Sequence, residues 1–167
     1  YEVAIETRST ASPPERWSAA EVVSGPGGKL VAQMMPPIKA TRILKPVKLT
    51  EPKPGVFVFD LGQNLAGFAE LSLRAPAGTK VVMKYGERLG QDGLLDRADI
   101  QQHVMRVDTN QQFQTDTYIA KGKGRESWHS RFTYHGFQYV EVTGFPGKPT
   151  LESLRGVFIH SAVPVAG

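Results

Sequence analysis

Acidic residues are the side chains of this chain that could support glycosidic bond cleavage. That chemistry needs two carboxyl groups flanking the bond, roughly 6.5 to 9.5 Å apart in an inverting enzyme. Five carboxylates lie on or beside segments that alternate like strands: Asp60, Glu70, Glu87, Glu126 and Glu141. No sequence feature pairs two of them across a cleft. We interpret all five as solvated or ion-paired strand residues and predict no catalytic residue among them.

Metal binding has little support in the sequence. Four aspartates, Asp92, Asp96, Asp99 and Asp108, could offer oxygen ligands to calcium, but their spacing does not match an EF-hand loop. The four histidines, His103, His129, His135 and His160, lack the spacing of a zinc site, and the chain has no cysteine. A Gly-x-Ser-x-Gly nucleophile motif is also absent from the sequence. We therefore predict no metal site and no cofactor.

Exposed aromatic residues could stack on the apolar face of a sugar. The candidates are Trp17, Trp128, Tyr134 and Tyr139. Aromatic residues in strand-rich domains are more often buried, so we favour a core position for Trp128 and keep sugar stacking as the alternative. His135 could hold a strand bend by bonding a backbone carbonyl, or it could project toward a neighbouring domain.

The composition fits one ordinary globular domain with or without an appendage. The 167 residues carry a formal charge of +4, and the basic residues are spread along the chain, unlike the concentrated patches of nucleic-acid-binding proteins. The tight basic run 121–125 contains two glycines and favours a solvated hairpin turn over a phosphate-binding loop. No apolar window approaches a membrane span. A cysteine-free chain fits the cytosol and also a secreted or periplasmic bacterial protein, and our prediction leans to the latter.

Short strands separated by turns are predicted from residue 55 onward. Val56–Phe59 is a continuous apolar run, and Ala69, Leu71 and Leu73 alternate with polar residues. Further strands are predicted at 80–85, 116–120, 127–132, 137–142 and 154–160. The pattern predicts an all-β fold, an antiparallel β-sandwich of two packed sheets. The segment 90–115 is a long loop with at most one short helix.

The first fifty residues are rich in proline and glycine, which exclude long helices. Strands are plausible at 30–34 and 40–49. We interpret residues 1–50 as the trailing β-rich segment of a preceding domain plus a linker strand, and residues 51–167 as the sandwich. The start at Tyr1, without methionine, suggests a piece of a longer chain.

Two glycine-containing segments stand out. In 131–142, dense aromatics and Gly136 predict two extended segments that meet at a bend, with Gly136 in a conformation unfavourable to other residues. In 60–64, Asp60 and Gly62 predict a structural turn, while Gln63 and Asn64 are polar groups that could contact a neighbouring domain.

Taken in order, the motifs resemble those of bacterial α-L-rhamnosidases of the glycoside hydrolase family 78 type, in the concanavalin-like domain that precedes the catalytic (α/α)6 barrel. The resemblance covers residues 55–164 and rests on these segments: Asp60 to Gly67, Pro76-Ala77-Gly78, Tyr85-Gly86-Glu87, Asp92-Gly93, Asp116-Thr117-Tyr118, Phe132 to Val142 and His160 to Pro164. The segment between Asp92-Gly93 and Asp116 is longer than the family pattern and lacks its tyrosine.

The resemblance implies a jelly-roll or concanavalin-like accessory domain that orients a catalytic barrel of the same chain, which hydrolyses terminal α-L-rhamnose from glycans or glycosides. Because the general acid and base of that family lie in the barrel, this chain is expected to be inactive alone. The alternative is an autonomous carbohydrate-binding module for rhamnose-containing glycans. Neither interpretation involves nucleic acid or a membrane. Contact residues for sugar or for a neighbouring domain are predicted to be Gln63, Asn64, Trp128, Tyr134 and His135.

Overall fold

The computed structural model describes residues 21–25, 27–101 and 113–164. The chain divides into two compact units, Tyr1–Met34 and Met35–Gly167. In the first unit, residues 21–25 and 27–34 contain no helix or strand, so the strand predicted at 30–34 is wrong. In the second unit the first two strands already pair with the main sheet. The division of the chain at residue 50 into a preceding domain and a sandwich stays a prediction.

The described residues of the second unit form ten strands and two short helical segments. They are β1 (Ile38–Leu44), β2 (Lys48–Lys53), β3 (Val56–Arg74), β4 (Lys80–Gly86), β5 (Arg88–Leu89), β6 (Leu95–Asp96), α1 (Ala98–Gln101), β7 (Thr115–Ile119), β8 (Arg125–Trp128), β9 (His135–Thr143), the 3-10 turn η1 (Leu151–Ser153) and β10 (Leu154–Ser161). The predicted antiparallel all-β fold is confirmed.

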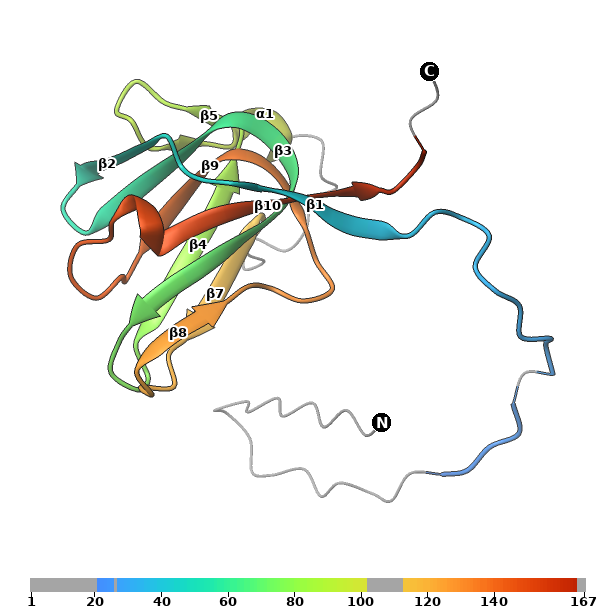
Figure 1. Cartoon of the computed structure of the whole chain (residues 1–167). Helices are drawn as coiled ribbons and strands as arrows, with labels where there is room; N and C mark the ends of the chain where they lie inside the picture. Colours follow the sequence, from blue (N-terminus) through green and yellow to red (C-terminus); the bar gives the residue numbers. More distant parts are fainter. Residues whose placement is uncertain (1–20, 26, 102–112, 165–167) are drawn as a thin grey trace. The chain divides into compact units, whose positions relative to one another are not determined.

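Eight of these strands form one curled antiparallel sheet. Six follow the order β1-β10-β3-β9-β4-β7, and β2 and β8 each pair with β3. The 19-residue strand β3 takes part in both halves of the sheet. Its first half pairs with β2 and β9, and its second half pairs with β10 and β8. Figure 1 shows β3 turning back near its middle. The two predicted sheets are therefore continuous with each other, because one long strand carries the backbone hydrogen bonds from one half into the other.

The bend in β3 is built from the 60–64 segment. Pairing between β3 and β9 shifts register between Asp60 and Leu65. Gly62 lies at φ 75°, and its N–H donates to Asp60 Oδ1 at 2.7 Å. The Gln138 amide donates to the same oxygen at 3.0 Å. An aspartate that accepts from the backbone two residues on, followed by a glycine in the left-handed region, is a turn. The predicted contacts of a turn are present, but they bend a strand that continues from Val56 to Arg74 instead of ending it.

The core lies inside the curl of the sheet. It combines the alternating residues of β3 with those of β4, β7, β9 and β10. The fully buried large side chains are Tyr85, Phe59, Phe137, Leu71, Met83, Leu154, Val81, Val140 and Val142. In β4, Val81, Met83 and Tyr85 are buried while Lys80, Val82 and Lys84 are not. The predicted alternation in β3 and β4 is therefore confirmed.

Gly136 is not at a bend. It lies within β9, pairs with Ala66 and has no positive φ. An added Cβ would meet nothing nearer than Glu87 Oε1 at 3.5 Å. The turn instead precedes β9, where Phe132 takes a positive φ of 60°. The prediction for Gly136 was wrong because the change of direction falls on the residues before the strand, at a residue that is not glycine.

The segment 90–115 contains the short helix α1, in agreement with the prediction of one short helix. Asp92 and Gly93 form a turn in which Asp92 Oδ1 accepts from the Leu94 N–H at 3.1 Å. Asp108 and His103 lie outside the described residues. In the described part of the chain, no helix is long and apolar enough to cross a membrane.

Candidate functional site

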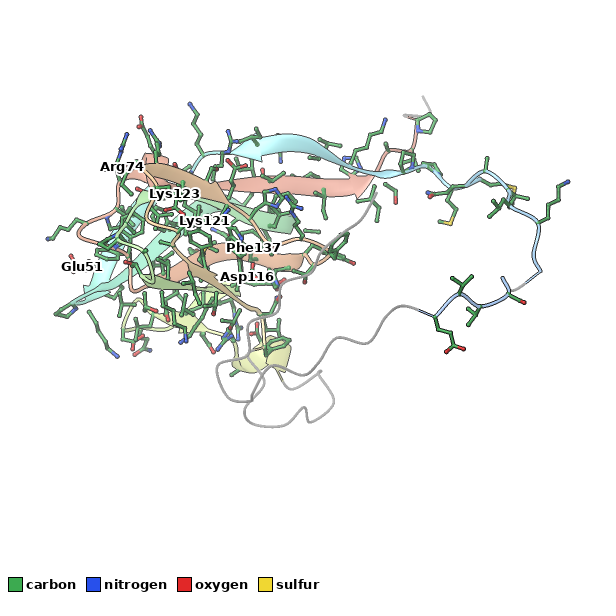
Figure 2. All side chains as sticks on the ribbon, turned by 90° about the horizontal axis from the view of Figure 1, so that it is seen from below. Glu51, Arg74, Asp116, Lys121, Lys123 and Phe137 are labelled. Atoms are coloured by element: carbon green, nitrogen blue, oxygen red, sulfur yellow. The ribbon has the colours of Figure 1, made fainter. Side chains whose placement is uncertain are left out.

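A buried polar cluster lies where β4, β7 and β9 meet. The Tyr85 hydroxyl donates to Asp116 Oδ2 at 2.7 Å, and His135 Nε2 lies 3.2 Å from Asp116 Oδ1. His135 Nδ1 lies 2.6 Å from Gln114 Oε1, and the Gln114 amide donates to the Gly136 carbonyl at 3.1 Å. Figure 2 shows Asp116 and Phe137 within the strand-rich body of the domain. The cluster links three strands mainly through side chains.

The cluster is shielded from solvent and packed against aromatic rings. Tyr85, Asp116 and His135 are buried. The Tyr85 ring stacks on His135 with centroids 4.1 Å apart and meets Phe137 edge-on at 4.8 Å. Burial and the neighbouring Asp116 carboxylate raise the pKa of the Tyr85 phenol well above its usual range. Burial alone would raise the pKa of Asp116, but hydrogen bonds from His135 and Tyr85 outweigh it and the net pKa lies below its usual range.

These contacts correct the backbone hydrogen bond predicted for His135. The imidazole bonds two side chains, Gln114 and Asp116, rather than a backbone carbonyl. Gln114 lies at φ 48°, in the left-handed region that costs a non-glycine residue of order 1 to 3 kcal/mol. A buried network with satisfied partners specifies strand packing, and a substrate would have no access to it.

A second buried carboxylate, Glu126, caps the turn between β7 and β8. Its side chain accepts the backbone N–H groups of Lys121, Gly122 and Lys123 at 2.9, 2.8 and 3.3 Å, and it also accepts the Tyr118 hydroxyl. The hydrogen bonds from Tyr118 and the Lys121 N–H, followed by those of the next two residues, lower the pKa of Glu126 to about 2. Burial and Glu126 raise the pKa of Tyr118 to about 12.

The run 121–125 is thus a turn between strands, as predicted, with Gly122 and Gly124 at positive φ. It is not the predicted hairpin, because β7 pairs with β4 and β8 pairs with β3. In Figure 2, Lys121, Lys123 and Arg74 lie at one end of the domain. Glu126 itself is buried rather than solvated, which the sequence interpretation missed. Its position directly after a glycine-rich turn is the signal that could have identified a carboxylate capping the turn N–H groups.

The five predicted contact residues lie in different settings. Gln63 accepts from Arg42 at 2.8 Å, and Asn64 Oδ1 accepts from the next backbone N–H. Trp128 is half-buried and stacks on Tyr118 with centroids 5.2 Å apart. Tyr134 is 61% exposed, whereas the adjacent His135 is buried. Among the described residues, no hydrogen bond or ring contact joins two of these five side chains, and their roles in sugar or domain contact stay predictions.

Glu70 and Glu141 also have internal partners. Glu70 accepts from Arg155 at 2.7 Å and from Ser127 at 2.9 Å. Glu141 accepts from the Leu95 N–H at 3.1 Å and lies 3.6 Å from Lys84. Glu70 and Glu152 line one small pocket of about 220 Å³ together with Arg125 and Arg155. Glu152 is exposed there, so the pocket lacks the buried carboxylic acid that protonates a glycosidic oxygen.

Two of the aspartates considered as calcium ligands, Asp96 and Asp99, pair with an arginine. Arg88 lies 3.0 Å from Asp99 and 3.8 Å from Asp96. Asp92 lies 3.8 Å from Lys53. Within residues 21–25, 27–101 and 113–164, no group of three or more histidine, aspartate or glutamate side chains could hold a metal ion.

Two open grooves lie on the outer face of the sheet. One, of about 580 Å³, is lined by polar and apolar residues that include Arg42, Phe68, Glu70, His129 and Arg155. In it Phe68 stacks on His129 with centroids 4.6 Å apart. The other, of about 730 Å³, shares Phe68 and His129 and continues to Phe132 and Tyr134. Together they form one extended concave surface, which is the candidate contact site.

Comparison with known proteins places this geometry in a family. Residues 50–160 match the family model described as the bacterial alpha-L-rhamnosidase concanavalin-like domain. An alpha-L-rhamnosidase of Streptomyces avermitilis is 44% identical over 136 residues, which are 81% of this chain and 12% of that protein. One of Formosa agariphila is 28% identical over 90% of this chain and 15% of that protein.

Solved structures agree in fold. The Streptomyces avermitilis alpha-L-rhamnosidase complexed with L-rhamnose superposes with a TM-score of 0.72 at 44% identity, over 81% of this chain and 12% of that one. The enzyme of Dictyoglumus thermophilum superposes with a TM-score of 0.71 at 40% identity, over 82% of this chain and 15% of that one. This chain therefore spans only 12 to 15% of the length of these relatives.

Proposed function

This chain belongs to the family of bacterial α-L-rhamnosidase concanavalin-like domains, and we propose that it is a non-catalytic module that packs on and orients the catalytic barrel of an α-L-rhamnosidase. This role requires a longer polypeptide. The matched relatives are many times longer than this chain, which supports that requirement. The parent enzyme would remove terminal α-L-rhamnose from glycans or glycosides.

The main support for a non-catalytic role is that the carboxylates are already bound to partners within the domain. Glycoside hydrolysis needs a protonated acid and an ionised partner on either side of the bond. Glu126 is committed to a turn, Asp116 to a buried tyrosine and histidine, and Glu70 to an arginine. The pKa values of Glu126 and Asp116 are both lowered, which is opposite to the shift that a general acid needs.

The carbohydrate-binding alternative has weaker support. A sugar-stacking site needs an aromatic face open to solvent. One face of Trp128 packs on Tyr118, and Phe68 packs on His129. Tyr134 is exposed, yet no ring partner or hydrogen bond fixes its orientation among the described contacts. A scaffold role explains the same surface without a ligand.

Hydrolysis of an aryl α-L-rhamnoside by the isolated chain and by the longer polypeptide tests the proposal. We expect turnover by the longer polypeptide and none above background by the chain. Turnover by the chain alone, lost in Glu70→Gln or Glu152→Gln, would place catalysis in this domain and end the proposal.

A further inference from the structure

An apolar patch lies on the outer face of the sheet, at the end where β1 and β10 run together. We define the Phe132 patch by five side chains: Ile38, Phe68, Phe132, Tyr134 and Ile159. All five line the same open groove of about 730 Å³. Ile38, Phe132 and Tyr134 are each more than half exposed, and Phe132 is fully exposed. Contiguous apolar surface of this kind is uncommon on a free monomer and marks a contact site.

Phe132 has an unusual backbone as well as an exposed side chain. It lies at φ 60°, a conformation that glycine or asparagine adopts with less strain. A fully exposed phenylalanine gains nothing from packing within the domain that would offset this strain. Strained residues persist where function requires their geometry. The loop before β9 therefore presents an aromatic ring outward at a cost to the isolated domain.

The position of the patch points to its occupant. Ile38 pairs with Ser161 at the end of β10, and the Ala162 N–H donates to the Pro37 carbonyl at 2.9 Å. The chain thus leaves the sheet beside Ile38, and the next residue, Val163, is 61% exposed. Figure 1 shows β10 and β1 extending together away from the curled sheet. A domain that follows Pro164 in the same polypeptide would therefore be connected to this one beside the patch.

We propose that the Phe132 patch is the docking surface for the domain that follows residue 164, with Phe132 inserted into a pocket of that domain. This inference rests on the proposed function, because it needs a longer polypeptide. The lengths of the relatives support the presence of further domains, since this chain covers only 12% of one relative and 15% of another. Domain interfaces within a chain bury about 600 to 1,500 Å² and centre on aromatic anchors.

Phe132→Asn in the longer polypeptide separates docking from folding. Asparagine tolerates the left-handed conformation, so the isolated chain should unfold at the same denaturant concentration or a slightly higher one. In the longer polypeptide, loss of the anchor should raise the rate of limited proteolysis between the domains, after residue 161, by about tenfold or more. Ile119→Thr is the matched control, because Ile119 is 62% exposed on β7 at the opposite edge of the sheet.

The possible outcomes separate the two proposals. Faster cleavage in Phe132→Asn but not in Ile119→Thr supports docking through the patch. Unchanged cleavage in Phe132→Asn, with activity or stability lost on deletion of residues 35–164, rejects the patch but keeps the scaffold role. Unchanged activity and stability after that deletion reject the scaffold role itself. Concentration-dependent dimerisation of the isolated chain that Phe132→Asn abolishes, with cleavage of the longer polypeptide unaffected, assigns the patch to a second copy and overturns the inference.

Discussion

The Tyr85 hydroxyl donates a hydrogen bond to Asp116 Oδ2 at 2.7 Å, although the residues are 31 positions apart in the chain. Strand pairing makes this contact possible, since Met83 lies opposite Asp116 in the β4–β7 ladder and Tyr85 lies two residues along. Asp116 also meets His135 on β9, so one carboxylate links three strands. These contacts hold the start of β7 against β4 and β9.

Tyr85→Phe should destabilise the domain by about 1 to 3 kcal/mol, because it removes a donor from a buried carboxylate and leaves the rest of the ring in place. Urea unfolding monitored by far-UV circular dichroism measures the change. Tyr134→Phe is the matched control, since that hydroxyl is on an exposed side chain and its loss should change the free energy by less than about 0.5 kcal/mol. Equal effects of the two substitutions would contradict the role of the cluster.

Acid should weaken the domain through Glu126. Its pKa is lowered from 4.5 to about 2 in the folded state, so its stabilisation is fully present above about pH 4.5 and is lost as the pH falls toward 2. Glu126→Gln should therefore lower stability at pH 7 and flatten the dependence on pH between about 5 and 2. Urea midpoints at several pH values measure both effects.

Glu152→Gln provides the comparison for Glu126, because Glu152 is exposed on the 3-10 turn. That variant should keep the pH dependence of the unsubstituted chain. A Glu126→Gln variant with an unaltered acid profile would show that the turn is held by other contacts.

Two glycines in paired strands should respond differently to alanine. A Cβ on Gly67 would lie 1.9 Å from the Val157 carbonyl oxygen, whereas one on Gly136 would lie 3.5 Å from the flexible end of Glu87. Gly67→Ala should cost about 1 to 3 kcal/mol or more through strand displacement, and Gly136→Ala should be neutral or slightly stabilising. Thermal unfolding of both variants measures the difference. Comparable losses of stability in the two variants would contradict the close approach of β3 and β10 at Gly67.

L-Rhamnose should not bind the isolated chain with saturation. One face of Trp128 is covered by Tyr118, so sugar should leave the fluorescence of the described tryptophan unchanged. Titration of the chain and of Trp128→Phe detects binding, and any signal shared by both proteins reflects other residues such as Trp17. A saturable signal that Trp128→Phe abolishes would favour the carbohydrate-binding module.

Local patterns predicted much of this fold. Both halves of β3 were identified from the sequence, one from the apolar run at 56–59 and the other from the alternation of Ala69, Leu71 and Leu73 with polar residues. Such patterns are informative because the spacing of apolar residues along a strand reflects which of its faces are buried. The sequence could not show that these two segments are one strand joining the halves of the sheet. Asp60 and Gly62 read as a turn between strands, whereas in the structure they bend a strand that continues.

The candidate site was harder to predict than the fold. Tyr85, Asp116 and His135 come from three strands, so their meeting depends on register, which single segments do not reveal. The bend was assigned to Gly136 because glycine is the usual residue in the left-handed region, yet Phe132 takes that conformation. The contact that we propose for Phe132 lies outside the domain, and such contacts leave no local pattern in the sequence.

The central claim is that this domain supports a catalytic domain without taking part in the chemistry. Deletion of residues 35–164 from the longer polypeptide, followed by thermal unfolding and hydrolysis of an aryl α-L-rhamnoside, tests it most directly. The account predicts a lower unfolding temperature for the remaining domain and loss of activity at temperatures where the intact protein is active, with residual turnover in the cold. An unchanged unfolding temperature and full activity after the deletion would contradict it.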